Sequence, residues 1–232
     1  MNPDPTILIP ALDESVNIRE VIRTVRRTVS ADIIVIDDAS TDATAAIARE
    51  EGARVLPLLL RLGAWGAIRT GIRYANARGF DIVVTMDADG QHPPASIHDL
   101  IAPIIARQAD VVVGSCTQRG SVARKLSWLF FRKLTGLNIL DLTSGFRAYN
   151  AAAISALMTA DTALLDYQDI GVLLALTRAG MRIVEVPVRM CPRINGHSRV
   201  FSTWWDVLRY LFITGILCLS KWNLPVVREV DS

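Results

Sequence analysis

The sequence predicts an α/β domain with a mostly parallel central sheet. Two patterns alternate along the first half of the chain: short apolar runs rich in β-branched residues, and longer segments in which apolar residues recur every three or four positions. Continuous apolar runs are typical of parallel strands that are buried on both faces. Their alternation with helical segments favours βαβ units over a sandwich or a bundle.

Each strand of the first half is marked by a short apolar run. Pro10 closes the first run, and Asp37 and Asp38 close the second. Proline cannot donate to a sheet ladder, and strands buried on both faces are mostly apolar, so these residues mark strand ends. The strands are therefore expected at residues 6–10, 33–36, 53–60, 81–86 and 110–114.

The helices between these strands carry their own start and stop signals. The first has an apolar stripe from Val16 to Val29 at helical spacing. The segment 40–42 supplies N-cap residues for the second helix, and Gly52 follows its end. The segment Pro93-Pro94 opens the fourth helix. We therefore expect helices at residues 15–29, 43–51, 66–77 and 93–107.

The second half is less regular and ends in an aromatic-rich segment. Helices are expected at 122–134, 169–179 and from Ser202, and strands at 146–149 and 182–189. We divide the chain into an α/β domain, residues 1–200, and a C-terminal helix and tail, residues 201–232. The apolar stretch 210–219 is shorter than the roughly 20 residues that span a bilayer. Two interpretations stay open: an interfacial helix with Trp and Tyr at headgroup depth, or a helix packed on this domain or on a second copy.

Composition excludes several classes of protein. The 232 residues include 25 Lys and Arg against 23 Asp and Glu, so a nucleic-acid binder with an overall basic surface is not expected. The three cysteines form no CxxC pair, which argues against a disulfide framework or zinc site and fits a reducing cytoplasm. The first residues do not form a secretory signal. The glycine segment 63–66 matches neither a dinucleotide fingerprint nor a P-loop.

Acidic residues follow three of the predicted strands. These clusters are Asp13-Glu14, Asp37-Asp38 and Asp87-Ala88-Asp89-Gly90-Gln91. The carboxyl ends of parallel strands meet at one edge, where open α/β sheets bind ligands. Converging carboxylates repel one another unless a cation intervenes, and their oxygens suit Mg²⁺ or Mn²⁺. Alone, the third cluster is best interpreted as an Asx-rich turn. Three clusters at successive strand ends favour a site for a divalent metal and a diphosphate.

Several motifs, taken in order, resemble the family 2 inverting glycosyltransferases. The resemblance is closest to the dolichol-phosphate mannose synthase branch, which charges polyprenyl phosphates with sugars. It runs from about residue 6 to 200. The motifs are Ile9-Pro10-Ala11-Leu12-Asp13-Glu14, Ile36-Asp37-Asp38-Ala39-Ser40-Thr41-Asp42, Met86-Asp87-Ala88-Asp89-Gly90-Gln91-His92-Pro93, Ser144-Gly145-Phe146-Arg147, Glu185-Val186-Pro187-Val188 and Arg193-Ile194-Asn195-Gly196-His197-Ser198-Arg199.

The resemblance implies a GT-A fold, a Rossmann-like nucleotide-sugar domain, and assigns roles to the acidic motifs. The donor-binding residues would be Pro10, Ala11, Asp13, Glu14, Asp38 and Asp87, with Asp38 reading the base. Asp87, Asp89 and Gln91 would hold Mg²⁺ or Mn²⁺ on the diphosphate, and Asp89 would also be catalytic. Such a metal would neutralise the charge that develops on the leaving nucleoside diphosphate.

The later basic residues fit an acceptor phosphate. A lipid phosphate is ionised near neutral pH, so it needs cations to position it, and the planar guanidinium of Arg matches phosphate oxygens. Cys116 stands where the family commonly has Arg, so we expect Arg119 or Arg124 to take over this catalytic contact. The residues expected at the acceptor phosphate are Arg124, Arg132, Arg193, Ser198 and Arg199.

We therefore expect a metal-dependent inverting glycosyltransferase that moves a hexose from a nucleoside diphosphate sugar to polyprenyl phosphate. It would lie in the cytoplasm, peripherally on the inner face of the membrane, and a homo-oligomer is not excluded. Two alternatives stay open. A hydroxyl acceptor would require a carboxylate base, for which Asp166 and Asp169 are the candidates, although Asp169 fits a helix N-terminus equally well. The departures at Arg61, Trp65 and Cys116 leave room for a degenerate nucleotide-sugar-binding protein.

Overall fold

The computed structural model describes residues 4–116, 137, 139–158 and 170–191, and the structural statements below concern these residues. The helices expected at 122–134 and from Ser202 lie outside the described residues, as does the whole segment 201–232. Among the described helices, none combines the length and the apolar character that a bilayer span requires.

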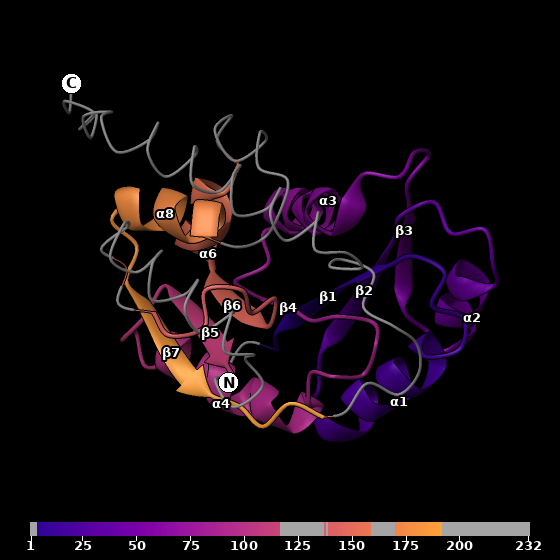
Figure 1. Ribbon diagram of the computed structural model, residues 1–232, viewed down its shortest axis with the longest axis horizontal. Coiled ribbons are helices and arrows are strands. Elements are labelled where there is room, and N and C mark those ends of the chain that lie inside the picture. The colour runs from indigo at the N-terminus through magenta and orange to yellow at the C-terminus, as the bar shows by residue number, and fades with distance from the viewer. Residues whose placement is uncertain (1–3, 117–136, 138, 159–169, 192–232) are drawn as a thin grey trace, which may run out of the picture.

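The described part of the chain forms a three-layer α/β fold around a mixed sheet (Figure 1). The strands are β1 (Thr6–Ala11), β2 (Asp32–Asp37), β3 (Arg54–Pro57), β4 (Ile82–Thr85), β5 (Val111–Ser115), β6 (Arg147–Asn150) and β7 (Ile183–Pro187). Their order across the sheet is β3-β2-β1-β4-β6-β5-β7. Strand β6 runs antiparallel to β4 and β5, and the other neighbouring pairs are parallel. The predicted α/β class with a mostly parallel sheet is confirmed.

Helices cover both faces of the sheet (Figure 1). One layer holds α1 (Ile18–Thr28), α2 (Thr44–Glu50), the 3₁₀ turn η1 (Pro94–Ser96) and α4 (Ile97–Ile105). The other holds α3 (Gly63–Arg78), α6 (Ala151–Ala156) and α8 (Ile170–Arg178). Because strands such as β2 are buried on both faces, their continuous apolar runs supply side chains to both cores.

Several element boundaries differ from the sequence prediction, among them the start of α4, which begins at Ile97 after the 3₁₀ turn and not at Pro93. Strand β3 ends at Pro57 rather than at residue 60, because it is an edge strand that pairs only with β2 and stops where β2 stops. Helix α1 begins at Ile18, so Val16 precedes it and is 72% exposed instead of lying on its buried stripe. Helix α3 begins at Gly63, three residues earlier than expected. The short helix α6 was not predicted.

Candidate functional site

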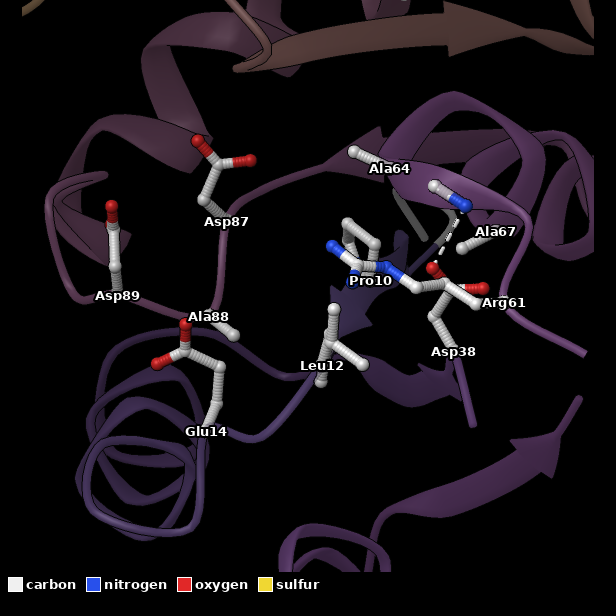
Figure 2. A pocket seen from close by; sticks show the side chains of 12 residues that line it. Pro10, Leu12, Glu14, Asp38, Arg61, Ala64, Ala67, Asp87, Ala88 and Asp89 are labelled. Atoms are coloured by element: carbon white, nitrogen blue, oxygen red, sulfur yellow. Dashed lines mark hydrogen bonds between the residues drawn. The ribbon is translucent and has the colours of Figure 1, made fainter. Parts of the chain in front are cut away.

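An open pocket of about 210 Å³ lies at the carboxyl edge of the sheet, where β1, β2 and β4 end against the start of α3 (Figure 2). Glu14, Asp87 and Asp89 stand on one side of it, and Asp38 and Arg61 stand on the other. The complete lining is Pro10, Ala11, Leu12, Glu14, Asp38, Arg61, Gly63, Ala64, Ala67, Asp87, Ala88 and Asp89. The structure therefore brings together residues from all three acidic clusters, as the strand-end argument expects.

The loops that follow β1 and β2 are held together by hydrogen bonds. Asp13 is central: its backbone N–H donates to Ser40 Oγ (3.0 Å), and its Oδ1 accepts from the Thr41 backbone N–H (2.8 Å). The Glu14 N–H donates to Thr44 Oγ1 (2.7 Å), one residue further along each loop. Asp13 has a φ of 48° and does not line the pocket. Its side chain thus holds the two loops in register, and the nucleoside contact expected for it stays a prediction.

Asp42 completes this loop pair from the other side. Its Oδ2 accepts from the Ser15 N–H (3.1 Å), and its Oδ1 accepts from the Thr44 N–H (2.9 Å) and hydroxyl (2.5 Å). Burial acts to raise the pKa of Asp42, but these hydrogen bonds outweigh burial and lower the pKa to about 2. The carboxylate is therefore ionised at neutral pH and fixes the start of α2.

Asp38 is buried, with 3% of its surface exposed, and both of its carboxylate oxygens are engaged. Oδ1 accepts from the Leu62 N–H (2.6 Å) and Oδ2 accepts from the Gly63 N–H (2.8 Å), which are the first N–H groups of α3. A carboxylate at this position satisfies donors that have no partner within the helix and interacts favourably with the helix dipole. This contact explains why α3 begins at Gly63. Asp38 also lines the pocket, so it joins the pocket to the helix that borders it.

The loop after β4 is organised by His92. The Asp87 backbone N–H donates to His92 Nδ1 (2.9 Å), and the imidazole stacks on Phe146 with ring centroids 4.8 Å apart. His92 is buried, whereas the Asp87 side chain is 48% exposed. His92 Nε2 lies 3.7 Å from Asp87 Oδ2. These contacts show that His92 shapes the loop, since its Nδ1 accepts the Asp87 N–H.

Asp89 and Gln91 occupy the same loop but differ in what they offer the pocket. Asp89 lines it and is buried, and its Oδ1 accepts the Gln91 N–H (3.0 Å). Gln91 does not line the pocket. No three His, Cys, Asp or Glu side chains of the described residues are grouped so that they could hold a metal ion. Two carboxylates at a pocket do fit a Mg²⁺ or Mn²⁺ ion whose remaining ligands are diphosphate oxygens and water.

Two features near the site were not anticipated as contributors. Arg61, noted in the sequence only as a departure, is the cation that lines this pocket within the described residues. Arg147 is fully buried: its Nε donates to the Ser144 carbonyl (2.8 Å) and its Nη2 to the Leu142 carbonyl (3.3 Å). Arg147 thereby shapes the loop before β6, whose Phe146 supports His92. The motif 144–147 signalled this segment without indicating its role.

The loop before β6 is also tied to the end of β5 and to the middle of β7. Asp141 Oδ2 accepts from the Cys116 N–H (3.2 Å), and the Asp141 N–H donates to Glu185 Oε1 (2.8 Å). Ser144 Oγ donates to the Gly114 carbonyl (2.5 Å). The acceptor residues expected from the sequence lie outside the described residues, namely Arg119, Arg124, Arg132, Arg193, Ser198 and Arg199, as do Asp166 and Asp169. Their roles stay predictions.

The sheet order and the acidic pocket at its carboxyl edge define a class of protein, the glycosyltransferases of GT-A fold. Within that class the chain belongs to glycosyl transferase family 2, whose model matches residues 6–158. The predicted family and fold are thus confirmed, and the chain is a glycosyltransferase.

Individual relatives agree with this assignment. An undecaprenyl-phosphate mannosyltransferase of Micrococcus luteus is 35% identical over 189 residues, which cover 73% of this chain and 76% of the relative. A polyprenol monophosphomannose synthase of Mycolicibacterium smegmatis is 29% identical over 215 residues, or 84% of this chain and 80% of the relative. Among solved structures, a glucosyl-3-phosphoglycerate synthase of Mycobacterium tuberculosis, crystallised with Mn²⁺, UDP-glucose and phosphoglyceric acid, has a TM-score of 0.73 at 21% identity and covers 96% of this chain and 81% of that one.

Proposed function

We propose that this chain transfers a hexose from a nucleoside diphosphate sugar to polyprenyl phosphate at the inner face of the membrane, with inversion at the anomeric carbon. The observation that carries the proposal is the pocket in which Asp38, Asp87 and Asp89 converge from two strand ends beside Arg61. The mannosyltransferase and synthase named above support the choice of a polyprenyl phosphate acceptor.

The chemistry is a direct displacement. A phosphate oxygen of the acceptor attacks the anomeric carbon and forms the new C–O bond, while the bond from that carbon to the diphosphate oxygen breaks. The electron pair of the broken bond leaves with the nucleoside diphosphate. No proton has to be removed from the nucleophile, because a phosphate monoester is already ionised near neutral pH. This chemistry therefore needs no general base, which a hydroxyl acceptor would require.

The residues in and around the pocket would have separate roles in binding the donor, the metal ion and the leaving diphosphate. Asp38 and the start of α3 border the donor on one side, and Arg61 offers a cation to its phosphates. Asp87 and Asp89, with Gln91 as a further oxygen donor, would hold Mg²⁺ or Mn²⁺. Such an ion would neutralise the charge that develops on the leaving diphosphate. His92 and Phe146 hold the backbone of Asp87 in place.

The test replaces Asp87 and Asp89 singly by Asn, a change that keeps side-chain size and removes the charge. Loss of one preorganised electrostatic contact at a developing charge costs about 10² to 10³ in kcat, and we expect at least this loss for each variant with a labelled nucleotide sugar and polyprenyl phosphate. Asp81→Asn, at an exposed position, is the matched control and should retain full activity. Full turnover by either site variant in the presence of a chelator would refute the metal assignment.

The product identifies the acceptor. A sugar joined to a lipid phosphate is a glycosyl phosphate, which mild acid cleaves, whereas a glycoside formed on a hydroxyl survives the same treatment. We expect the labelled lipid product to be acid-labile. An acid-stable product would favour the hydroxyl acceptor instead, and binding of the donor without turnover against any acceptor would favour a non-catalytic nucleotide-sugar-binding protein.

A further inference from the structure

The segment from Gly52 to Phe80, which contains β3, the following loop and α3, has an unusual charge distribution. It carries five arginines and no Asp or Glu, although the whole chain has a net charge of only +2. The other 203 residues (232 less 29) therefore carry a net charge of −3. The arginines are Arg54, Arg61, Arg69, Arg73 and Arg78.

The loop between β3 and α3 exposes apolar side chains next to these arginines. Leu59 is 98% exposed, Leu60 73% and Leu62 54%. Because Arg61 stands among them and is itself exposed, the tip of this loop is both apolar and basic. Within the described residues, the other large apolar side chains that are exposed, Val16 and Leu140, also lie in loops at the carboxyl edge of the sheet.

The basic surface continues along the outer side of α3. Arg69 and Arg73 follow Leu62 at spacings of seven and eleven residues, so the three side chains lie on one stripe of the helix. Trp65, Ile68 and Ile72 are buried against the sheet. Arg73 is exposed, whereas Arg69 lies at the border with the buried side chains and is half-buried, with its Nε enclosed. Within the described residues, Arg61, Arg69 and Arg73 form no ion pair. Arg54 and Arg78 differ, because both guanidinium groups lie over the ring of Tyr74, at 5.9 and 5.2 Å.

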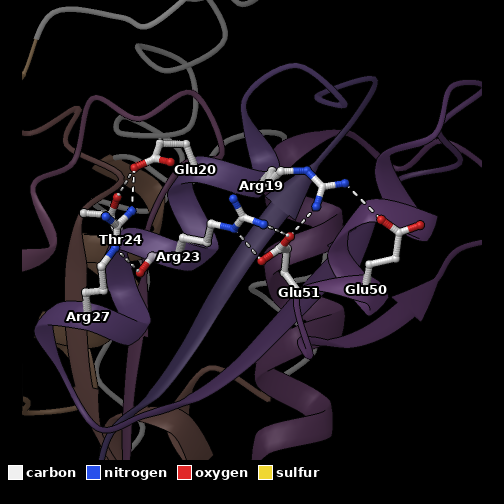
Figure 3. A network of polar contacts seen from close by, with 7 residues as sticks. All are labelled: Arg19, Glu20, Arg23, Thr24, Arg27, Glu50 and Glu51. Carbon is white, nitrogen blue, oxygen red and sulfur yellow. Dashed lines mark hydrogen bonds and ion pairs between the residues drawn. The ribbon is translucent and has the colours of Figure 1, made fainter.

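The other helical layer shows a contrasting pattern (Figure 3). Its charged side chains are of both signs and bind one another across α1 and α2. Arg23 Nε lies 2.8 Å from Glu51 Oε2, and Arg19 pairs with both Glu50 and Glu51. Hydrogen bonding to Arg23 is the main cause that lowers the pKa of Glu51. On this side, in α1 and α2, most of the cations are ion-paired, Arg26 and Arg49 being the exceptions within the described residues, whereas Arg61, Arg69 and Arg73 on the α3 side form no ion pair with any described residue.

We propose that the loop 58–62 and the outer stripe of α3 form a docking surface for an anionic lipid bilayer, in which Leu59 and Leu60 enter the headgroup region and Arg69 and Arg73 face lipid phosphates. An apolar tip beside cations that have no ion pair among the described residues is the combination that binds such membranes, because apolar burial and attraction to anionic lipid add. Exposed leucine side chains suit acyl chains better than the bases of a nucleic acid, which stack on exposed aromatic side chains, and the nearby Trp65 is buried.

This surface borders the pocket directly, since Arg61 and Gly63 belong to both. The inference rests on the proposed function in one respect: docking here would place the donor pocket beside the membrane in which a polyprenyl phosphate is dissolved. The surface lies within residues 58–73 and is separate in sequence from the segment 201–232, for which an interfacial helix is one of two open interpretations.

The test places an environment-sensitive dye at the loop tip of the full-length chain. Leu59→Cys is labelled in a Cys191→Ser, Cys218→Ser background, and the remaining Cys116 is buried. Gln108→Cys, exposed at the opposite edge of the sheet, is the matched control. Each protein is titrated with phosphatidylcholine vesicles, with or without phosphatidylglycerol, in the absence of donor and acceptor. We expect the dye at residue 59 alone to shift to the blue, and only with phosphatidylglycerol present.

Vesicle sedimentation of variants then measures separately how much apolar burial and electrostatic attraction contribute to membrane affinity. Burial of one leucine is worth at least about a tenfold change in affinity, so Leu59→Gln/Leu60→Gln should weaken binding by at least that factor. Each arginine near an anionic surface is worth about fivefold, so Arg69→Gln/Arg73→Gln should weaken it by up to about 25-fold and flatten the dependence on phosphatidylglycerol. Arg49→Gln, on α2, should change nothing. Unchanged thermal unfolding confirms that each variant is folded.

The outcomes separate docking from catalysis. Equal dye responses at residues 59 and 108, or none at either, would overturn the docking surface. A blue shift that grows with protein concentration without vesicles would overturn it in favour of self-association. Because no turnover is involved, failure of the transferase assay would leave this result standing. Transfer to a short-chain polyprenyl phosphate in detergent should be unaffected by Leu59→Gln/Leu60→Gln.

Discussion

Asp38 offers the sharpest test of the link between the donor site and the fold. If its carboxylate caps α3, its removal should destabilise the protein, whereas a residue that only contacts a nucleoside could be replaced without loss of stability. The capping interpretation rests on two hydrogen bonds from backbone N–H groups, of 2.6 and 2.8 Å, to a side chain that is 3% exposed.

The expected magnitude follows from these contacts. A hydrogen bond to a charged group contributes about 1.5 to 3 kcal/mol. Leu62 is exposed, so water can partly replace the lost acceptor and the lower value applies. Asp38→Ala should therefore lower the free energy of unfolding by about 3 kcal/mol, and Asp38→Asn, which keeps one acceptor oxygen, by about half as much. For a chain of this size, about 3 kcal/mol corresponds to about 6 to 12 °C in Tm.

Urea unfolding followed by far-UV circular dichroism measures these differences. Asp81→Ala is the control, because Asp81 is exposed and a surface substitution of this kind changes stability by less than about 0.5 kcal/mol. If Asp38→Ala proved no less stable than Asp81→Ala, the capping role would be refuted, and with it the reason given for the early start of α3.

Two further predictions follow from the polar contacts. Hydrogen bonds from the Arg182 side chain are the main cause that lowers the pKa of Asp110 from 3.8 to about 2. The ionised carboxylate therefore stabilises the fold above about pH 4, and this contribution disappears as the pH falls to about 2. The stability difference between wild type and Asp110→Asn should thus be about 1 to 2 kcal/mol at pH 7, allowing for the exposed arginine partner, and close to zero at pH 2; a difference that persisted at pH 2 would contradict this origin. His92→Phe preserves the stacked ring but leaves the Asp87 N–H without its acceptor, so kcat should fall about tenfold or more. His92→Asn retains an acceptor and should recover part of the lost kcat. Equal activity of the two variants would show that the hydrogen bond of His92 does not position this loop.

The sequence supported the fold class because the physical signal was strong and local. Runs such as Ile33–Ile36 are apolar at every position, which only a strand buried on both faces requires. The acidic clusters could be placed at one edge for the same reason, since parallel strands bring their carboxyl ends together. Pro10, Glu14 and Asp87 accordingly line one pocket.

Other features depended on contacts between residues far apart in the chain. The start of α3 is set by the hydrogen bond from the Gly63 N–H to Asp38, which lies 25 residues earlier in the chain. No local sequence pattern predicts this hydrogen bond. The contact of Asp13 with the Thr41 N–H also joins two loops that lie far apart in the chain, and the nucleoside contact expected for Asp13 stays a prediction. The stacking of His92 on Phe146 likewise joins residues 54 positions apart.

The reversed direction of β6 has a consequence for how this protein can diversify. Because β6 runs antiparallel between β4 and β5, its first residue rather than its last lies beside the pocket edge, and Arg147 pairs with Thr85 just before the Asp87 loop. The chain can therefore leave the sheet after β5, travel any distance, and return to the same edge without altering a single strand pairing. Within this connection, Ser144 bonds to the Gly114 carbonyl and Phe146 stacks on His92, so these residues belong to the edge of the sheet and not to a replaceable insertion. Insertion or replacement elsewhere in the connection can therefore leave the pocket lined by Asp87 and Asp89 unchanged.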